Sequence, residues 1–185
     1  RPMSRTRLDV ALVERGLAPT RAKAQAVVAA GLVRVGGVMI DKVATPIAAD
    51  AVVEVEPPPP FVSRGGQKLA GALDDTGLDA AGLDAIDLGA STGGFTDCLL
   101  QRGASRVIAV DVGYGQLAWS LRNDPRVTVM ERTNARHLTP QDLPFAPALV
   151  VCDVAFISIA TIWPAVARCA APGFTALMMV KPQFE

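Results

Sequence analysis

A glycine-rich turn lies in the middle of the chain and reads Asp87-Leu88-Gly89-Ala90-Ser91-Thr92-Gly93-Gly94-Phe95-Thr96. An apolar run at residues 85–88 predicts a strand before it, and a helix to Arg102 is expected after it. Glycines let a backbone press against a ligand, and the N–H groups at a helix start are hydrogen-bond donors. The turn therefore predicts a ligand site between a strand and a helix.

Strands and helices alternate from this turn onward. The expected elements are strands at residues 106–110, 127–131, 149–152 and 175–180, and helices around residues 116–122 and 159–169. This alternation predicts an α/β fold in which helices wrap a parallel sheet of the Rossmann type.

The chemistry of the turn narrows the class of cofactor. A dinucleotide fingerprint would need Gly-x-Gly-x-x-Gly, and a phosphate loop would need a lysine where Phe95 stands. An acidic opening residue instead suits S-adenosylmethionine, which carries a positive charge and an amino group. Asp111, ending the next strand, is expected to accept the ribose hydroxyls, and Asn134 to bond an adenine edge. The expected cofactor-binding residues are Asp87, Gly89, Ser91, Thr92, Gly93, Gly94, Phe95, Thr96, Asp111 and Asn134. The alternative is a nucleotide-free α/β core whose glycines serve packing.

Two other strand ends carry charged residues. Asp153 and Lys181 each directly follow an apolar run that predicts a strand. Because ligands lie outside the carboxyl ends of strands in open α/β sheets, both are expected beside the cofactor. Lys68, on a helix predicted at residues 63–73, is the third catalytic candidate. The alternative is that these lysines are surface residues that lie beside a carboxylate without a chemical role.

A ribose 2′-hydroxyl that attacks a methyl sulfonium needs accurate aim and help with its departing proton. A partly desolvated lysine crowded by another cation can accept that proton. Lys181 is therefore expected to act as the base or to orient the hydroxyl, and Asp153 to position Lys181. Lys68 would polarise the hydroxyl or hold the adjoining phosphate. Phe156 is either a platform for an unpaired base or, as we favour, a core side chain.

The N-terminal part differs in charge from the rest. Residues 1–49 hold eight basic and three acidic residues, a net charge of +5, whereas residues 63–185 hold ten and twelve, a net of −2. Helices at residues 7–15 and 21–30, a hairpin at 32–40 and a strand at 51–56 predict a small α+β unit suited to polyanions. The residues expected to meet RNA phosphates are Arg5, Arg7, Arg21, Lys23, Arg34, Lys42 and Arg64. Two domains are predicted, at residues 3–56 and 63–185, with a proline-rich linker at 57–62.

Composition argues against several other classes of protein. No apolar run approaches the roughly 18 residues of a membrane-spanning helix, and the first residues lack the apolar core of a secretory signal. The three cysteines, Cys98, Cys152 and Cys169, are odd in number and lack metal-ligand spacing. We therefore expect a cytoplasmic protein without a metal site, and the sequence indicates no stable protein partner.

Two known families share the motifs of this chain. The segments Arg7-Leu8-Asp9-Val10 and Thr20-Arg21-Ala22-Lys23-Ala24-Gln25, with the Gly36-Gly37 hairpin, resemble an S4 RNA-binding domain. The rest resembles the TlyA/haemolysin A family in the segment VSRGGQKL at residues 62–69, in the glycine-rich turn, and at residues 110–117, 152–158 and 180–185.

This resemblance implies an FtsJ-like catalytic domain that uses S-adenosylmethionine to methylate cytidine 2′-hydroxyls in the ribosomal RNA of ribosomal subunits. It also implies a Lys-Asp-Lys-Glu catalytic set whose first three members fall on Lys68, Asp153 and Lys181. The fourth, a glutamate, is expected beyond the last motif, so Glu185 is not that residue. The family's sheet also continues with further strands. We therefore expect a chain truncated at its C-terminal end, with weak or no activity alone.

Two other functions stay open. The chain is alternatively an RNA- or ribosome-binding protein with an inactive methyltransferase domain, or, with less support, a haemolysin. The linker at residues 57–61 also departs from the aromatic and basic tetrapeptide of the family, which puts the coupling of the domains in question.

Overall fold

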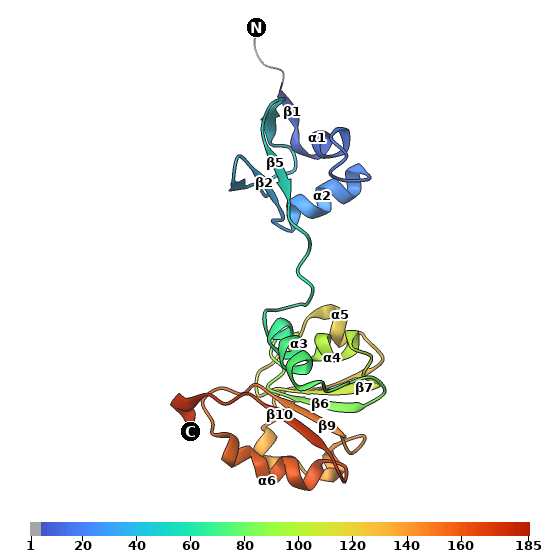
Figure 1. Cartoon of the computed structure of the whole chain (residues 1–185), viewed down its shortest axis with the longest axis vertical. Helices are drawn as coiled ribbons and strands as arrows, with labels where there is room; N and C mark the ends of the chain where they lie inside the picture. The colour runs from blue at the N-terminus through green and yellow to red at the C-terminus, as the bar shows by residue number, and fades with distance from the viewer. Residues whose placement is uncertain (1–4) are drawn as a thin grey trace. The chain divides into compact units, whose positions relative to one another are not determined.

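The computed structural model describes residues 5–185, and the chain divides into two compact units, residues 1–58 and 59–185 (Figure 1). Met3, the predicted start of the first domain, lies outside the described residues. Pro57–Pro60, where the units meet in the sequence, form neither helix nor strand, because proline lacks the N–H that either would need.

The first unit packs two short helices against small antiparallel sheets. Its elements are β1 Arg5–Arg7, α1 Leu8–Glu14, α2 Arg21–Ala29, β2 Val33–Val35, β3 Val38–Met39, β4 Pro46–Ala48 and β5 Val53–Val55. The helices, the β2–β3 hairpin and the β5 strand match the predicted α+β order, and the β1–β4 pair adds to it. Leu8, Leu12, Val28 and Val33 are fully buried and form the centre of its core.

The second unit is a five-stranded parallel sheet in the order β10-β9-β6-β7-β8. Its elements are α3 Gly65–Thr76, β6 Asp84–Leu88, α4 Gly94–Gln101, β7 Arg106–Val110, α5 Trp119–Arg122, β8 Val127–Met130, η1 Ala135–His137, η2 Pro140–Asp142, β9 Leu149–Cys152, α6 Ile159–Cys169, β10 Thr175–Met178 and η3 Pro182–Phe184. The predicted α/β class is confirmed. The helix predicted around residues 116–122 is shorter, because its first part forms the loop before α5.

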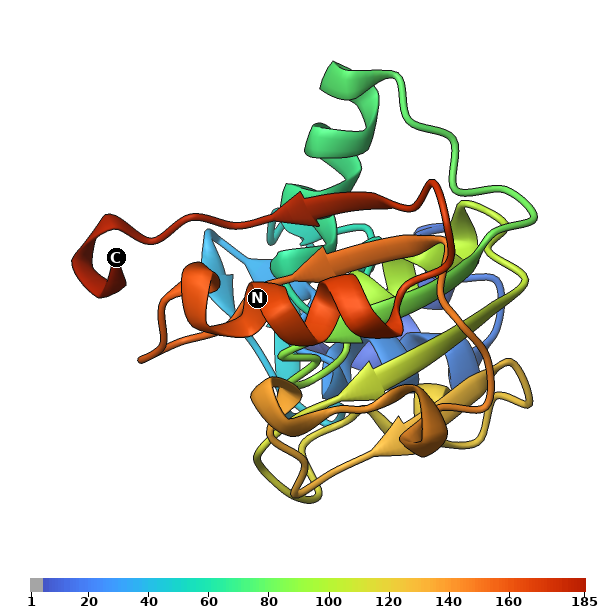
Figure 2. The same cartoon turned by 90° about the horizontal axis from the view of Figure 1, so that it is seen from below.

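Helices cover both faces of this sheet. In Figure 1, α3, α4 and α5 lie on one side of the strands and α6 lies on the other. Side chains alternate along each strand, so Ala85 and Asp87 of β6 face the first layer, while Ile86 and Leu88 face the second. Leu88 pairs with Val110 of β7 and with Cys152 of β9, so three central strands end at the same level. Figure 2 shows η3 projecting beyond the edge of the sheet.

The three cysteine thiols are buried in this unit and form no disulfide. Burial raises the pKa of Cys98 to about 11 and that of Cys152 to about 12, and it raises the pKa of Cys169 as well. Among residues 5–185, no helix is both long and apolar enough to cross a bilayer.

Candidate active site

A cavity of about 610 Å³ opens at the carboxyl ends of the central strands. Four of the predicted cofactor residues line it: Gly89, Ser91, Asp111 and Asn134. Asp153 and Lys181 line it too. Its volume lies within the range of small-molecule sites, and its place matches the crevice where open α/β sheets bind ligands.

Asp111 is held at the rim of this cavity by two backbone donors. The N–H of Ser91 donates to its Oδ2 and the N–H of Gly113 donates to its Oδ1, each at 2.7 Å. A carboxylate can accept about four hydrogen bonds, so both oxygens keep acceptor capacity for a ligand. Asn134 accepts the N–H of Arg136 through its side-chain oxygen, which leaves its amide group as a donor. The pair is suited to a ribose and to a base edge.

Gly89 brings the turn against the end of β9. Its φ is +83°, and a Cβ atom there would lie 2.3 Å from the backbone oxygen of Asp153. The N–H groups of Gly89 and Ala90 both donate to the oxygen of Val110 at 2.9 Å, and the N–H of Asp153 donates to Leu88. The turn is thus fixed to both neighbouring strand ends, and Asp153 lies directly beside it.

This close approach makes a testable difference between two glycines. Gly89→Ala is expected to destabilise the second unit more than Gly77→Ala, a residue with a similar φ of +68° but open space around it. Gly77→Ala should cost only the backbone strain, about 1–3 kcal/mol, whereas Gly89→Ala adds a clash with backbone. Urea unfolding followed by fluorescence of Trp119 and Trp163, both in this unit, measures the two. Equal losses would contradict the assigned packing.

Asp153 and Lys181 form an ion pair in the cavity. Lys181 Nζ lies 2.6 Å from Asp153 Oδ1, at angles outside those of a hydrogen bond, and each side chain is 26% exposed. Asp153 also lines a second cavity, of about 160 Å³, together with Lys68. Gly89 and Ser91 line both cavities. The structure therefore brings the three predicted catalytic residues to the two sides of one turn.

The remaining predicted cofactor residues are placed differently. Thr92, Gly94 and Phe95 line the smaller cavity beside Lys68. Gly93, at the start of α4, packs beneath Leu121 and Leu117. Asp87 and Thr96 are fully buried below the turn, so Asp87 supports the turn from inside.

Asp87 is the unusual buried group of this unit. Its Oδ2 accepts the hydroxyl of Thr96 at 2.8 Å, while its Oδ1 has no hydrogen-bond partner among the described residues. Burial raises the pKa of this carboxyl to about 7, against the Thr96 hydrogen bonds that lower it, and the charges of Asp153 and Asp111 raise it further. The carboxyl is therefore expected to hold a proton at mildly acidic pH.

This shift predicts a pH dependence of stability. Because the folded state holds the proton more tightly than the unfolded chain, the carboxyl stabilises the fold below pH 3.8, and this contribution is lost as the pH rises toward about 7. Relative to Asp87→Asn, the free energy of unfolding of the unsubstituted protein should fall by roughly 4 kcal/mol between pH 4 and 8. Urea titrations of both proteins across that range measure it. Parallel pH profiles would contradict the shift.

Loop residues with unusual backbone also line the larger cavity. Ser91 has a φ of +51° and Phe156 a φ of +64°, and such strain gathers at functional sites. Phe156 is 89% exposed, so the favoured core position for it was wrong: it lies in the loop between β9 and α6 and not in either element. Its ring centroid lies 5.3 Å from that of Phe184.

Glu185 fixes the end of the same loop. Its carboxylate accepts the hydroxyl of Ser158 at 2.8 Å and the N–H of Ile159 at 2.9 Å, and these bonds lower its pKa. Glu185 thus holds the start of α6.

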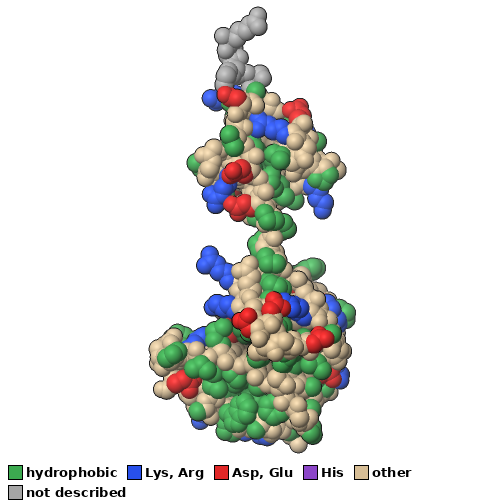
Figure 3. Space-filling model, in the orientation of Figure 1, with side chains coloured by type: hydrophobic (Ala, Val, Ile, Leu, Met, Phe, Trp, Pro, Cys, Tyr) green, Lys and Arg blue, Asp and Glu red, His purple; other side chains and the backbone are tan. Residues whose placement is uncertain are grey.

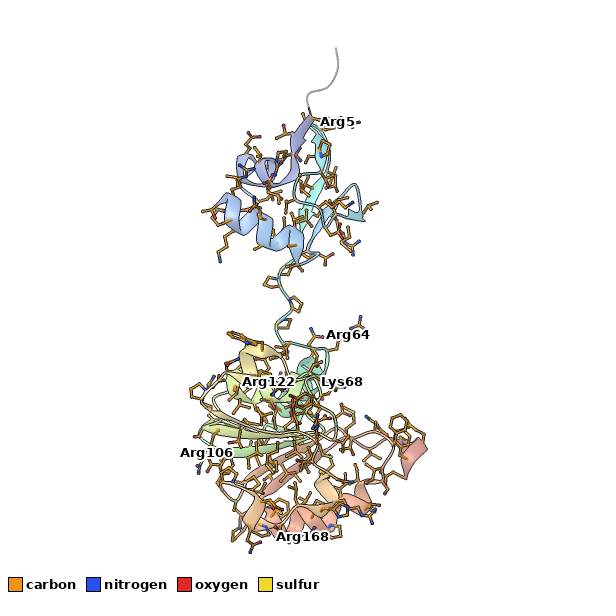
Figure 4. The ribbon with its side chains drawn as sticks, turned by 180° about the vertical axis from the view of Figure 1, so that it is seen from behind. Arg5, Arg64, Lys68, Arg106, Arg122 and Arg168 are labelled. Atoms are coloured by element: carbon orange, nitrogen blue, oxygen red, sulfur yellow. The ribbon has the colours of Figure 1, made fainter. Side chains whose placement is uncertain are left out.

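The predicted RNA-contacting residues are exposed, but they differ in what they bind. Arg7 and Arg21 contact the buried Asp9, whereas Arg34 pairs with the exposed Glu56 at 2.6 Å. Basic side chains on the visible face of the first unit are interspersed with acidic ones (Figure 3). Arg64, at the start of α3, lies near Lys68, while Arg106 and Arg168 lie on other parts of the unit (Figure 4).

The sequence left several cavity residues unassigned. Gly113 and Thr133 flank Asp111 and Asn134 in the sequence, and both line the cavity. Their closeness in the sequence to these two predicted residues was the signal that could have identified them as cavity residues. Val154 and Ile162 form an apolar wall that no sequence pattern distinguishes from core, and Val112 lines the cavity as an exposed side chain.

The chemistry of this cavity fits S-adenosylmethionine. An apolar wall suits an adenine ring, the Asp111 carboxylate suits a ribose, and the Asp153 carboxylate offers charge opposite a cationic group. The glycine at position 89 leaves room where a side chain would fill the turn.

Comparisons with known proteins cover both units. The family model for FtsJ-like methyltransferases matches residues 61–185, and the model for the S4 domain matches residues 6–53. A Mycobacterium tuberculosis protein named 16S/23S rRNA (cytidine-2′-O)-methyltransferase TlyA is 51% identical over 98% of this chain and 68% of its own. Hemolysin A of Brachyspira hyodysenteriae is 40% identical over 97% of this chain and 75% of its own. A solved structure of a Streptococcus thermophilus protein described as a hemolysin aligns with a TM-score of 0.69 at 43% identity, over 99% of this chain and 68% of that one.

Proposed function

The chain belongs to the FtsJ-like methyltransferase family and carries an S4 domain, and from this premise we propose that it methylates ribose 2′-hydroxyls of cytidines in ribosomal RNA. It is an S-adenosylmethionine-dependent methyltransferase. The observation that carries the proposal is the Asp153–Lys181 pair beside the glycine-rich turn, with Lys68 on the other side of Asp153. The 51% identical relative is named for this reaction.

The residues around the larger cavity would hold the cofactor. Asp111 would accept its ribose hydroxyls and Asn134 would donate to its adenine, while Gly89 leaves room beside Asp153 for its amino-acid end. When bound, S-adenosylmethionine supplies an electrophilic methyl group. Asp87 supports this arrangement from below, because its bond to Thr96 ties the turn to α4.

The catalytic work falls to the charged residues on both sides of the turn. Lys181, held by Asp153 through the 2.6 Å contact, orients the 2′-hydroxyl as an ammonium, or takes the hydroxyl proton as a neutral amine that has first given up its own proton to solvent. Lys68 polarises the hydroxyl or holds the adjoining phosphate. The 2′-hydroxyl is a weak nucleophile, and an amine close to it would orient it for attack.

The first unit binds the RNA. Residues 3–56 form the RNA-binding domain, residues 57–62 the linker and residues 63–185 the catalytic domain. The exposed arginines and lysines of the first domain, with Arg64, meet phosphates and so position the substrate without reading its sequence. The protein acts in the cytoplasm on ribosomal subunits.

Mapping of ribose methylation tests the function directly. Ribosomal RNA from cells with and without this protein is compared, and at least one methylated cytidine is expected to disappear with the protein. Methylation patterns that are identical in both would refute the proposal. Calorimetric titration with S-adenosylmethionine then separates an inactive RNA-binding protein, which would take up no cofactor, from an enzyme.

A further inference from the structure

Asp9 lies fully buried in the first unit, where four residues donate five hydrogen bonds to its carboxylate. Arg7 donates through Nε and Nη2, both at 3.1 Å, and Arg21 donates through Nε at 2.9 Å. Gln25 donates at 3.0 Å, and the N–H of Val10 donates at 3.1 Å. The partners come from the end of β1 and from both helices, so one acid joins three elements.

A buried carboxylate is costly unless charges and hydrogen bonds compensate it. Here the compensation is sufficient: the Arg7 and Gln25 hydrogen bonds, helped by Arg21, hold the pKa of Asp9 well below its usual range, against burial. Asp9 is therefore ionised at any physiological pH. Its charge, and with it the contacts to Arg7 and Arg21, therefore stays the same across the physiological pH range.

The guanidinium groups of Arg7 and Arg21 are held close together by Asp9, and each keeps N–H donors that Asp9 does not use. Arg7 Nη2 and Arg21 Nε both donate to the same oxygen, Oδ2, and therefore lie within about 6 Å of each other. The arginine side chains are 47% and 57% exposed. Among residues 5–185, no acceptor is bound to Nη1 of Arg7 or to either Nη group of Arg21, so these groups can donate to an outside acceptor.

We propose that Asp9 is a positioning residue that holds Arg7 and Arg21 side by side as one two-guanidinium site for an RNA phosphate. The inference rests on the proposed RNA binding by this unit. Without the acid between them, two like charges would repel and turn apart. With it, the forked donors are fixed before RNA arrives, so little side-chain freedom is lost on binding.

A matched pair of substitutions tests this, because simple electrostatics and positioning predict opposite signs. Asp9→Asn and Glu56→Gln each remove one negative charge beside an arginine of the same unit. Charge alone would strengthen RNA binding in both. Positioning predicts that Asp9→Asn weakens affinity for a ribosomal RNA transcript by about 10- to 100-fold, while Glu56→Gln does not weaken it. The dependence of log affinity on log salt should flatten by about one phosphate contact in Asp9→Asn alone.

A second background separates positioning from loss of folding. In Arg7→Gln/Arg21→Gln protein, the further change Asp9→Asn should cost no RNA affinity and should raise the unfolding midpoint, because it removes an uncompensated buried charge. If Asp9 has only a structural role, Asp9→Asn lowers RNA affinity both in the unsubstituted protein and in the Arg7→Gln/Arg21→Gln protein, and the inference fails. Equal affinities of Asp9→Asn and Glu56→Gln protein would also overturn it. If the unsubstituted protein does not bind the transcript, the proposed RNA-binding function fails instead.

Discussion

Replacing Lys181 with methionine is expected to slow methyl transfer by about 10²- to 10⁴-fold, the usual contribution of a positioned acid–base group. Methionine keeps much of the length of the side chain and removes the amine that pairs with Asp153 at 2.6 Å. Cofactor affinity should change little, because in the proposed site the ribose, adenine and amino-acid end are held by other residues. The first effect is measured as the rate of tritiated methyl incorporation into ribosomal subunits, with protein in excess over subunits so that a weak activity of the unsubstituted chain is detected, and calorimetry measures the second.

Lys181→Arg is the matched control for charge. Arginine keeps a cation beside Asp153, but its guanidinium is forked and cannot be deprotonated in proteins. An arginine variant as slow as the methionine variant would indicate that the amine takes the proton, and partial activity would indicate that it orients the hydroxyl. Turnover by the methionine variant at the unsubstituted rate would remove Lys181 from the mechanism.

Asp111→Ala is expected to weaken binding of S-adenosylmethionine by about 10²- to 10⁴-fold. Each hydrogen bond to a charged group contributes about 1.5–3 kcal/mol, and two ribose hydroxyls would be lost together. The change also frees the N–H groups of Ser91 and Gly113, which shape the rim of the cavity. Isothermal titration with the cofactor gives the dissociation constants.

Asp74→Ala serves as the control for this experiment. Asp74 is an exposed acid on α3 of the same unit. Its Oδ1 lies 2.8 Å from Nη1 of Arg102. Its removal changes the net charge equally, so cofactor affinity should stay as in the unsubstituted protein. Unchanged affinity in the Asp111 variant would mean that the ribose is held elsewhere.

The buried sheet could be predicted from the sequence because its strands need nearly continuous apolar runs. The β6, β7 and β9 strands follow such runs closely. The β1 and β4 strands could not be predicted in this way. Each has three residues, β1 is Arg-Thr-Arg and β4 begins with Pro46, and they are strands because they pair with each other.

The position of a site residue could be predicted when the residue follows the end of a strand. It was harder to predict when the residue lies inside a strand. Asp111, Asp153 and Lys181 come after their strands, so they lie at the cavity whichever way the strand side chains alternate. Asp87 lies inside β6, and the alternation turns it toward the helix layer that contains Thr96. The Arg34–Glu56 pair depends on the pairing of β2 with β5, which sequence spacing does not contain.

The three buried thiols have a practical consequence. A thiolate is the form that reacts with alkylating reagents, and the raised pKa values keep Cys98, Cys152 and Cys169 protonated near neutral pH. A new cysteine at Val112, which is 71% exposed at the mouth of the larger cavity, would therefore take a maleimide dye first. A fluorescent label that reports ligand binding can therefore be attached to an introduced cysteine without first removing the three native cysteines.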